Sequence, residues 1–343
     1  MRKTFIDACM LLVAVCMWTD GRSQPSTVSA SSKNNVLSIA YFIESANNSL
    51  NSLNSLLKKD NYRNKIATLN NPAGSELGFN LKDEILRALT PLLDKAKATD
   101  KSKFKDIIAD LLENKEDNGL AGLTKLIPST GIFSTIFSLV GNLVITEKKI
   151  TREDLAAFTT KIQQYLSQYE KLNSINLQFS LQLQKLLMKT EEMKGDVKDF
   201  LVESCGMIND MGIKPNYKTM AVESILLTYY DPQRLQTWLD TVKRDSSRRL
   251  FPSDASTTVK TLASGIKKLQ KEFETAYNDN YTSLKDLLAQ LKTALPNIDQ
   301  KQLVKVTAEV EQLYADSKQA DVINLNLHLV DERMNTLTKL FNK

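Results

Sequence analysis

The chain is poor in the residues that make tight turns, disulfides and metal centres. Its 343 residues include 11 glycines, 8 prolines, 3 cysteines and a single histidine. Because glycine and proline mark most turns, so few of them favour long helices over a sheet with many short strands. One histidine cannot supply the usual ligand cluster of a zinc site, and no serine elbow or reactive cysteine accompanies it for a hydrolytic triad.

The motifs of common enzymes and cofactor sites are also missing. The sequence has no glycine loop that would cradle a phosphate, no Cys-x-x-Cys pair and no His-Glu-x-x-His. Residues 114–119 resemble the start of a calcium loop, but Lys125 stands where that loop needs a bidentate glutamate. We therefore expect no enzyme activity, no cofactor, no metal and no small-molecule substrate. Protein interaction or scaffolding is the function class that remains.

The N-terminus is typical of an export signal. Three residues with two basic side chains precede an apolar core at residues 8–18, which is too short to span a bilayer. Gly21 and Ser23 are suitably small for cleavage before Gln24. The pattern predicts a secreted or periplasmic protein, most simply a bacterial one. A retained membrane anchor and a lipoprotein modified at Cys16 are the alternatives.

Charge and cysteine content of the predicted mature chain limit its partners. The whole chain carries a net charge of +5, and residues 1–23 hold three basic and two acidic side chains, which leaves +4. Such a mild, mixed excess does not favour a nucleic-acid surface. Cys205 is the one cysteine after residue 23, so we expect no disulfide within the mature chain and a fold that depends on core burial.

A sustained seven-residue apolar repeat predicts one unbroken helix over residues 151–204. Thr151 and Asp154 resemble a capping box at its start, and at 1.5 Å per residue the helix would be roughly 80 Å long. Apolar residues at alternating steps of three and four keep one stripe against a partner helix. The two polar positions, Asn176 and Thr190, can fix register, as buried polar residues sometimes do. The stripe consists of Leu155, Phe158, Ile162, Tyr165, Tyr169, Leu172, Asn176, Phe179, Leu183, Leu186, Thr190, Met193, Val197 and Phe200.

Further apolar repeats predict additional helices, at about 35–59, 81–92, 104–112, 254–294 and 299–341. The last two form an expected antiparallel hairpin joined at residues 296–299. We therefore predict an all-α fold, an elongated bundle of long antiparallel helices with coiled-coil-like packing and one central apolar helix or hairpin. The expected segments are a signal peptide (1–23), a flexible lead-in (24–34), N-terminal helices (35–118), an apolar uncharged segment (119–146), a long heptad helix (147–214), a short helical subdomain (215–252) and a C-terminal long helical hairpin (253–343).

The uncharged segment contains the candidate contact residues. Between residues 119 and 146 the only charge is Lys125, and residues 126–145 have the length needed to cross a bilayer. Small and hydroxyl residues on the opposite side would suit packing against neighbours or against other copies. The segment is therefore a buried central helix, a membrane-inserting element, a permanent anchor or an oligomer contact. The candidate membrane or oligomer contact residues are Ile132, Phe133, Ile136, Phe137, Leu139, Val140, Leu143 and Val144.

Long helices with one uncharged central segment resemble, in architecture alone, the α-helical pore-forming toxins of the cytolysin A type. Here the apolar segment precedes the long helix and follows short ones, which departs from that arrangement. The resemblance implies a membrane-active protein that inserts residues 119–145. Our leading hypothesis is a non-catalytic interaction or scaffolding protein of the cell envelope or the exterior. It would bind a protein partner or another copy through a helix face, with membrane lipid as a further candidate partner and no nucleic acid.

Overall fold

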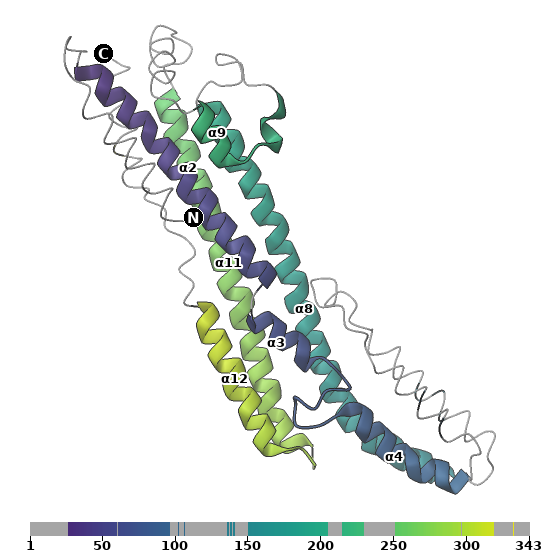
Figure 1. Cartoon of the computed structure of the whole chain (residues 1–343). Coiled ribbons are helices and arrows are strands. Elements are labelled where there is room, and N and C mark those ends of the chain that lie inside the picture. Colours follow the sequence, from purple (N-terminus) through teal and green to yellow (C-terminus); the bar gives the residue numbers. More distant parts are fainter. Residues whose placement is uncertain are drawn as a thin grey trace. The chain divides into compact units, whose positions relative to one another are not determined.

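The computed structural model of this chain is an all-α helical bundle, which confirms the predicted fold class (Figure 1). Across the part of the chain that the structure describes, every regular element is a helix and none is a strand. The elements are α2 (Thr27–Lys59), α3 (Asn61–Leu69), α4 (Leu81–Ala96), α8 (Arg152–Ser204), the 3-10 helix η1 (Pro215–Thr219), α9 (Val222–Tyr229), α11 (Phe251–Ala294) and α12 (Gln300–Lys318). The described residues are 27–59, 61–96, 102, 106, 136, 138, 140, 150–204, 215–229, 251–295, 297–318 and 332.

The chain divides into two compact units. Unit 1 comprises Met1–Ser45, Asp196–Ala263 and Leu325–Lys343, and unit 2 comprises Ala46–Gly195 and Ser264–Asn324. The boundaries fall inside α2, α8 and α11, so three helices each contribute residues to both units. Unit 2 contains α3, α4, α12 and most of α8, and the site described below belongs to this unit.

The predicted long helix is present, and its predicted stripe is buried. The helix α8 runs without interruption for 53 residues. Of the fourteen stripe positions, twelve are buried, while Leu155 and Met193 are half-buried. The seven-residue repeat was therefore the correct guide to the buried side of α8, because a stripe of that spacing stays on one side of a helix along its whole length.

The helix α2 starts earlier than the sequence pattern predicts. It begins at Thr27 instead of residue 35, so most of the predicted flexible lead-in is helical. Residues 27–34 contain no glycine or proline, and Pro25 is the last residue that would interrupt a helix there. The predicted apolar stripe of this helix is buried from Ile39 to Leu57.

A cluster of aromatic rings joins four helices at the centre of unit 2. Tyr62 of α3 lies 6.0 Å from Phe179 of α8, 5.6 Å from Tyr277 of α11 and 6.1 Å from Tyr314 of α12, measured between ring centroids. The Tyr62 hydroxyl donates a hydrogen bond to Asn280 Oδ1 at 2.8 Å. Edge-to-face and tilted ring pairs of this kind add to the free energy of burial.

The helices α11 and α12 form the predicted antiparallel hairpin over the described residues (Figure 1). Tyr281 stacks on Tyr314 with ring centroids 4.0 Å apart, and Tyr314 donates a hydrogen bond to Asn278 at 2.9 Å. Asp299 caps α12, because its carboxylate accepts hydrogen bonds from the backbone N–H groups of Lys301 and Gln302. The described residues of the predicted connection, 297–299, therefore lie between the two helices.

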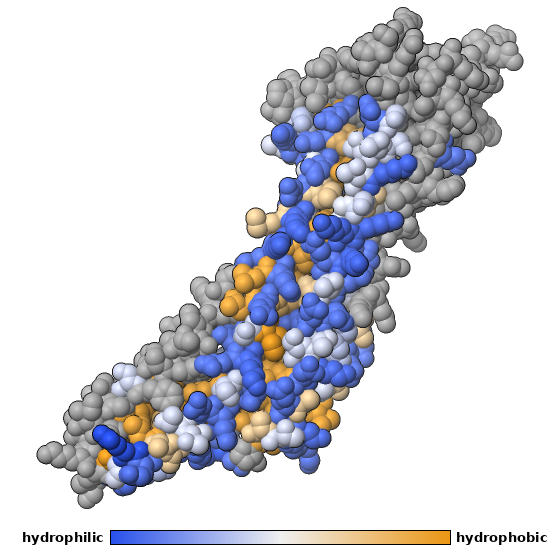
Figure 2. Space-filling model, turned by 180° about the vertical axis from the view of Figure 1, so that it is seen from behind, coloured by the Kyte–Doolittle hydropathy of each residue, from blue (hydrophilic) through white to orange (hydrophobic). Residues whose placement is uncertain are grey.

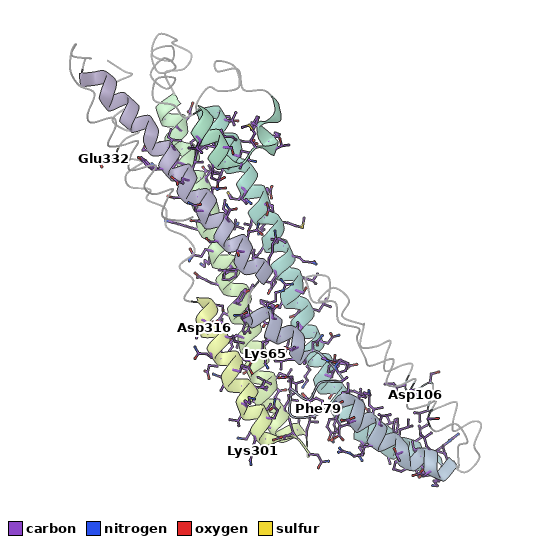
Figure 3. The ribbon with its side chains drawn as sticks, viewed as in Figure 1. Lys65, Phe79, Asp106, Lys301, Asp316 and Glu332 are labelled. Carbon is purple, nitrogen blue, oxygen red and sulfur yellow. The ribbon has the colours of Figure 1, made fainter. Side chains whose placement is uncertain are left out.

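The loop between α3 and α4 attaches to this hairpin. Gly78 O accepts a hydrogen bond of 2.7 Å from Asp299 N. Lys65 of α3 is labelled in Figure 3. Its Nζ lies 2.7 Å from Oε2 of Glu76 in the loop and 3.0 Å from Oε2 of Glu309 on α12. On the other side, Phe79 packs against Tyr165 of α8, with ring centroids 5.5 Å apart. The loop therefore joins α8 to the α11–α12 hairpin.

Several predicted segments lie outside the described residues. These are the signal peptide, most of the helix expected at 104–112, most of residues 119–146, residues 205–214 at the end of the predicted long helix, residues 230–250 of the predicted short helical subdomain, and the chain after residue 318 apart from Glu332. In the helix predicted at 104–112, Asp106 is described and helical. In the segment 119–146, Ile136, Ser138 and Val140 are described and helical.

Candidate protein-interaction surface on helix α8

The start of α8 is capped as the sequence pattern predicts. Thr151 Oγ1 accepts a hydrogen bond of 3.3 Å from Asp154 N, and the Asp154 carboxylate accepts one of 2.9 Å from Thr151 N. This reciprocal arrangement is a capping box with aspartate in the third helical position. Lys95 near the end of α4 forms an ion pair with the same carboxylate. The cap thus joins the start of α8 to the end of α4.

The cap predicts an acid-sensitive contribution to stability. The Lys95 ammonium and the hydrogen bonds from Thr151 lower the pKa of Asp154 to about 2, below the value of about 3.9 expected for an unfolded chain. Because the folded state favours the charged carboxylate, this contribution is complete above about pH 4 and is lost as the pH falls towards 2. We expect Asp154→Asn to melt below the parent at pH 7, with the gap closing near pH 2. An equal gap at both pH values would contradict this.

The buried side of α8 carries two polar residues one turn apart. Asn176 is fully buried, and neither atom of its side-chain amide has a hydrogen-bond partner within the described residues. The hydroxyl of Ser180 is likewise buried without one. Thr190, the other polar stripe position, donates its hydroxyl hydrogen bond to Leu186 O at 2.8 Å. An unpaired buried amide costs about 1–3 kcal/mol, so Asn176 is expected to lower the free energy of unfolding.

We expect Asn176→Leu to raise the free energy of unfolding by about 1–3 kcal/mol, because leucine fills a similar volume without an unpaired amide. Thr190→Val is the matched control, since the Thr190 hydroxyl is already paired. Denaturant unfolding of both variants measures the effect. A lower midpoint for Asn176→Leu would show that the amide is paired in solution.

The opposite side of α8 exposes apolar side chains. Leu177, Leu181 and Met188 are 41%, 55% and 74% exposed. Hydrophobic side chains also form patches between hydrophilic ones in the surface view (Figure 2). With 3.6 residues per turn, the three residues fall on one side of the helix, away from the buried stripe. We call this surface the outer face. It consists of Ser174, Leu177, Gln178, Leu181, Gln182, Lys185 and Met188, all exposed.

The outer face is almost without charge. Residues 172–184 are thirteen consecutive residues with no charged side chain. Lys185 is the one charged residue among the exposed positions between Ser174 and Met188. Exposed helix faces are normally rich in charge, and charged residues are depleted where proteins bind one another. This is the feature that our sequence reasoning missed, and the charge-free run could have revealed it.

Charged side chains border the outer face at each end. Lys171 is exposed on the N-terminal side, and its ammonium donates a hydrogen bond of 3.1 Å to Gln290 of α11. Glu192 is exposed on the C-terminal side. Lys171 and Glu192 therefore have opposite charges, and Lys185 and Glu191 are the exposed charged residues between them.

No protein-family model, curated protein or solved structure matches this chain. Its function must therefore be inferred from its own residues.

Two of the eight predicted contact residues are described by the structure. Ile136 and Val140 are buried, and Ser138 between them is exposed. Ile132, Phe133, Phe137, Leu139, Leu143 and Val144 lie outside the described residues. The structure does not bring Ile136 or Val140 to the surface, so the exposed apolar residues of α8 form a separate candidate site. Whether residues 119–145 contact a membrane or another copy stays a prediction.

None of the described helices is both long enough and apolar enough to cross a membrane. The described side chains also include no group of three or more His, Cys, Asp or Glu residues placed to hold a metal ion.

Proposed function

We propose that this chain is an exported, non-catalytic helical-bundle protein that acts in protein interaction or scaffolding, and that it binds its partner through the outer face of α8. The observation that supports the binding face is the charge-free run at residues 172–184. Leu177 and Leu181 in this run, and Met188 after it, are exposed to solvent. Removing apolar surface from water contributes about 25 cal/mol per Å². A partner helix laid on this face would gain that contribution without having to bury many charges.

The other side of α8 prepares this face for binding. Its apolar stripe is buried. Phe179, which lies between Leu177 and Leu181 in the sequence, packs against Tyr62 and Tyr277 in the aromatic cluster of unit 2. A face that is held rigid by a packed core loses little conformational entropy when it binds. The outer face is therefore suited to direct contact with an extended helical surface.

Photo-crosslinking in cells tests the interaction. A photoreactive amino acid at Leu181 should give covalent adducts with the partner. Val304 of α12 is the matched control. Its side chain is 62% exposed, similar to Leu181, but it lies outside the outer face and beside an exposed charged residue, Lys305. Adducts at Leu181 and none at Val304 are the expected result. The absence of adducts at both Leu181 and Met188 would overturn the proposed binding face.

Export is tested separately, because the proposal combines it with binding. Residues 1–30 fused to a reporter that is active only outside the cytoplasm should give activity in a bacterial host. Replacing two leucines of the apolar run, Leu11 and Leu12, by arginine should abolish it. A reporter that stays inactive with the natural residues would remove export from the proposal and leave the binding face untouched.

The membrane-active alternative makes a different prediction. If residues 119–145 insert into lipid, deletion of residues 126–145 should abolish vesicle binding and leave a folded bundle. If they belong to the core, as the burial of Ile136 and Val140 favours, the same deletion should unfold the protein. Circular dichroism and co-flotation with anionic liposomes, combined with dye leakage, distinguish the two results.

A further inference from the structure

We propose that the partner of the outer face is the same face of a second copy of this chain, laid antiparallel to the first. This inference rests on the proposed function, and it adds the identity and the register of the partner. A two-fold interface uses one surface patch twice, so that patch must be complementary to itself. The outer face of α8 meets this requirement in its apolar residues and in its charges.

The apolar residues are placed symmetrically about Gln182. Leu177 lies five residues before it and Met188 lies six residues after it. If the two-fold axis crosses the helix pair at the level of Gln182 along α8, Leu177 of each copy therefore lies opposite Met188 of the other. Leu181 of both copies then lies beside the axis. All three exposed apolar side chains of the outer face are buried by this one arrangement.

The charges at the two ends follow the same symmetry. Lys171 lies eleven residues before Gln182 and Glu192 lies ten residues after it. The antiparallel arrangement places Lys171 of each copy beside Glu192 of the other, which forms two ion pairs at the borders of the interface. Lys185 comes closest to the uncharged Gln178 of the other copy. A parallel arrangement would instead place Lys171 beside Lys171 and Glu192 beside Glu192, which is unfavourable.

The contact is short, so the expected complex is a weak dimer. From Lys171 to Glu192 the helix face is roughly 33 Å long at 1.5 Å per residue. Stable interfaces bury more than about 1,000 Å², and a single pair of helix faces of this length lies near the lower end of that range. The monomer–dimer equilibrium should therefore depend on concentration under ordinary laboratory conditions.

Sedimentation velocity of the purified full-length chain, in reducing buffer to prevent disulfide dimers, tests this proposal. The single variants Lys171→Glu and Glu192→Lys should each weaken the dimer roughly tenfold, because each replaces two attractive contacts by two repulsive ones. The double variant Lys171→Glu/Glu192→Lys should restore it. Recovery in the double variant separates the ion pair between copies from the loss of the Lys171–Gln290 hydrogen bond.

A second variant checks the centre of the interface. Leu181→Glu should abolish the dimer, since it places two carboxylates beside the axis. It should leave the helical circular dichroism unchanged, because Leu181 is more than half exposed. Val304→Glu is the matched control and should not change the dimer.

A chain that stays monomeric at high micromolar concentration would overturn the self-association. So would a double charge exchange that fails to restore the dimer. These failures differ from a failure of the proposed function. If the chain is monomeric while Leu181 still gives crosslinks to another protein in cells, the outer face is an interaction surface whose partner is not a second copy. If neither Leu181 nor Met188 gives crosslinks, both proposals fail.

Discussion

Ile162→Asp is expected to lower the free energy of unfolding by roughly 3–5 kcal/mol. Ile162 lies in the apolar stripe of α8 and its side chain is 1% exposed. The substitution removes the buried apolar surface of isoleucine and places a carboxylate in the buried apolar stripe of α8. An unpaired buried charge is among the few single changes that cost this much.

Gln163→Asp is the matched control, because Gln163 is the next residue on α8 and is exposed. It introduces the same side chain at nearly the same distance from the helix start, so it accounts for the effect of aspartate on the helix itself. Urea unfolding followed by circular dichroism measures both variants. Similar midpoints for Ile162→Asp and the parent protein would refute the assignment of the buried stripe.

Gly78→Ala is expected to cost roughly 3 kcal/mol, the sum of a backbone term and a steric term. Gly78 has a φ of 78°, in the left-handed region that residues with a Cβ rarely adopt. An added Cβ would lie 2.6 Å from Asp299 O and 3.0 Å from Ile298 Cγ1. The first of these atoms is backbone and cannot rotate away. The hydrogen bond from Asp299 N to Gly78 O would also be strained.

Gly195→Ala provides the control and should have the opposite sign. Gly195 lies inside α8, and an added Cβ would meet no atom within 4 Å. Alanine there should raise the free energy of unfolding by about 0.5–1 kcal/mol, because glycine weakens a helix interior. Thermal unfolding of the two variants compares them directly. If both glycine substitutions shift the melting temperature alike, the contact between Gly78 and the α11–α12 turn does not contribute to the free energy of unfolding.

The helices were predictable because their signals are local. The stripe from Phe158 to Phe200, the cap at Thr151 and the turn before α12 all follow from residues close together in the chain. Each depends on spacing or on a hydrogen bond across three residues. Element ends were harder, as the early start of α2 at Thr27 shows, since a run of Ser, Thr and Ala carries little preference either way.

The candidate surface was only partly predictable. The seven-residue repeat identifies the stronger apolar stripe of α8 as the buried one, but the sequence alone does not say whether a weaker second stripe also packs against another element or stays in solvent. The predicted contact residues lie between 132 and 144, and of these Ile136 and Val140 are described and buried. Leu177, Leu181 and Met188 were overlooked because the stronger stripe of the same helix had already explained its apolar content.

The amino-acid sequence by itself determined the all-α class and the buried side of α8, because periodic burial is a property of one helix and its solvent. Only the tertiary structure decided that Tyr62 would meet Phe179, Tyr277 and Tyr314, and that Gly78 would lie against Asp299, 221 residues further along the chain. Contacts at such separations depend on which helix faces pack together. That choice is made by the shapes of the packed side chains, which a one-dimensional pattern does not contain.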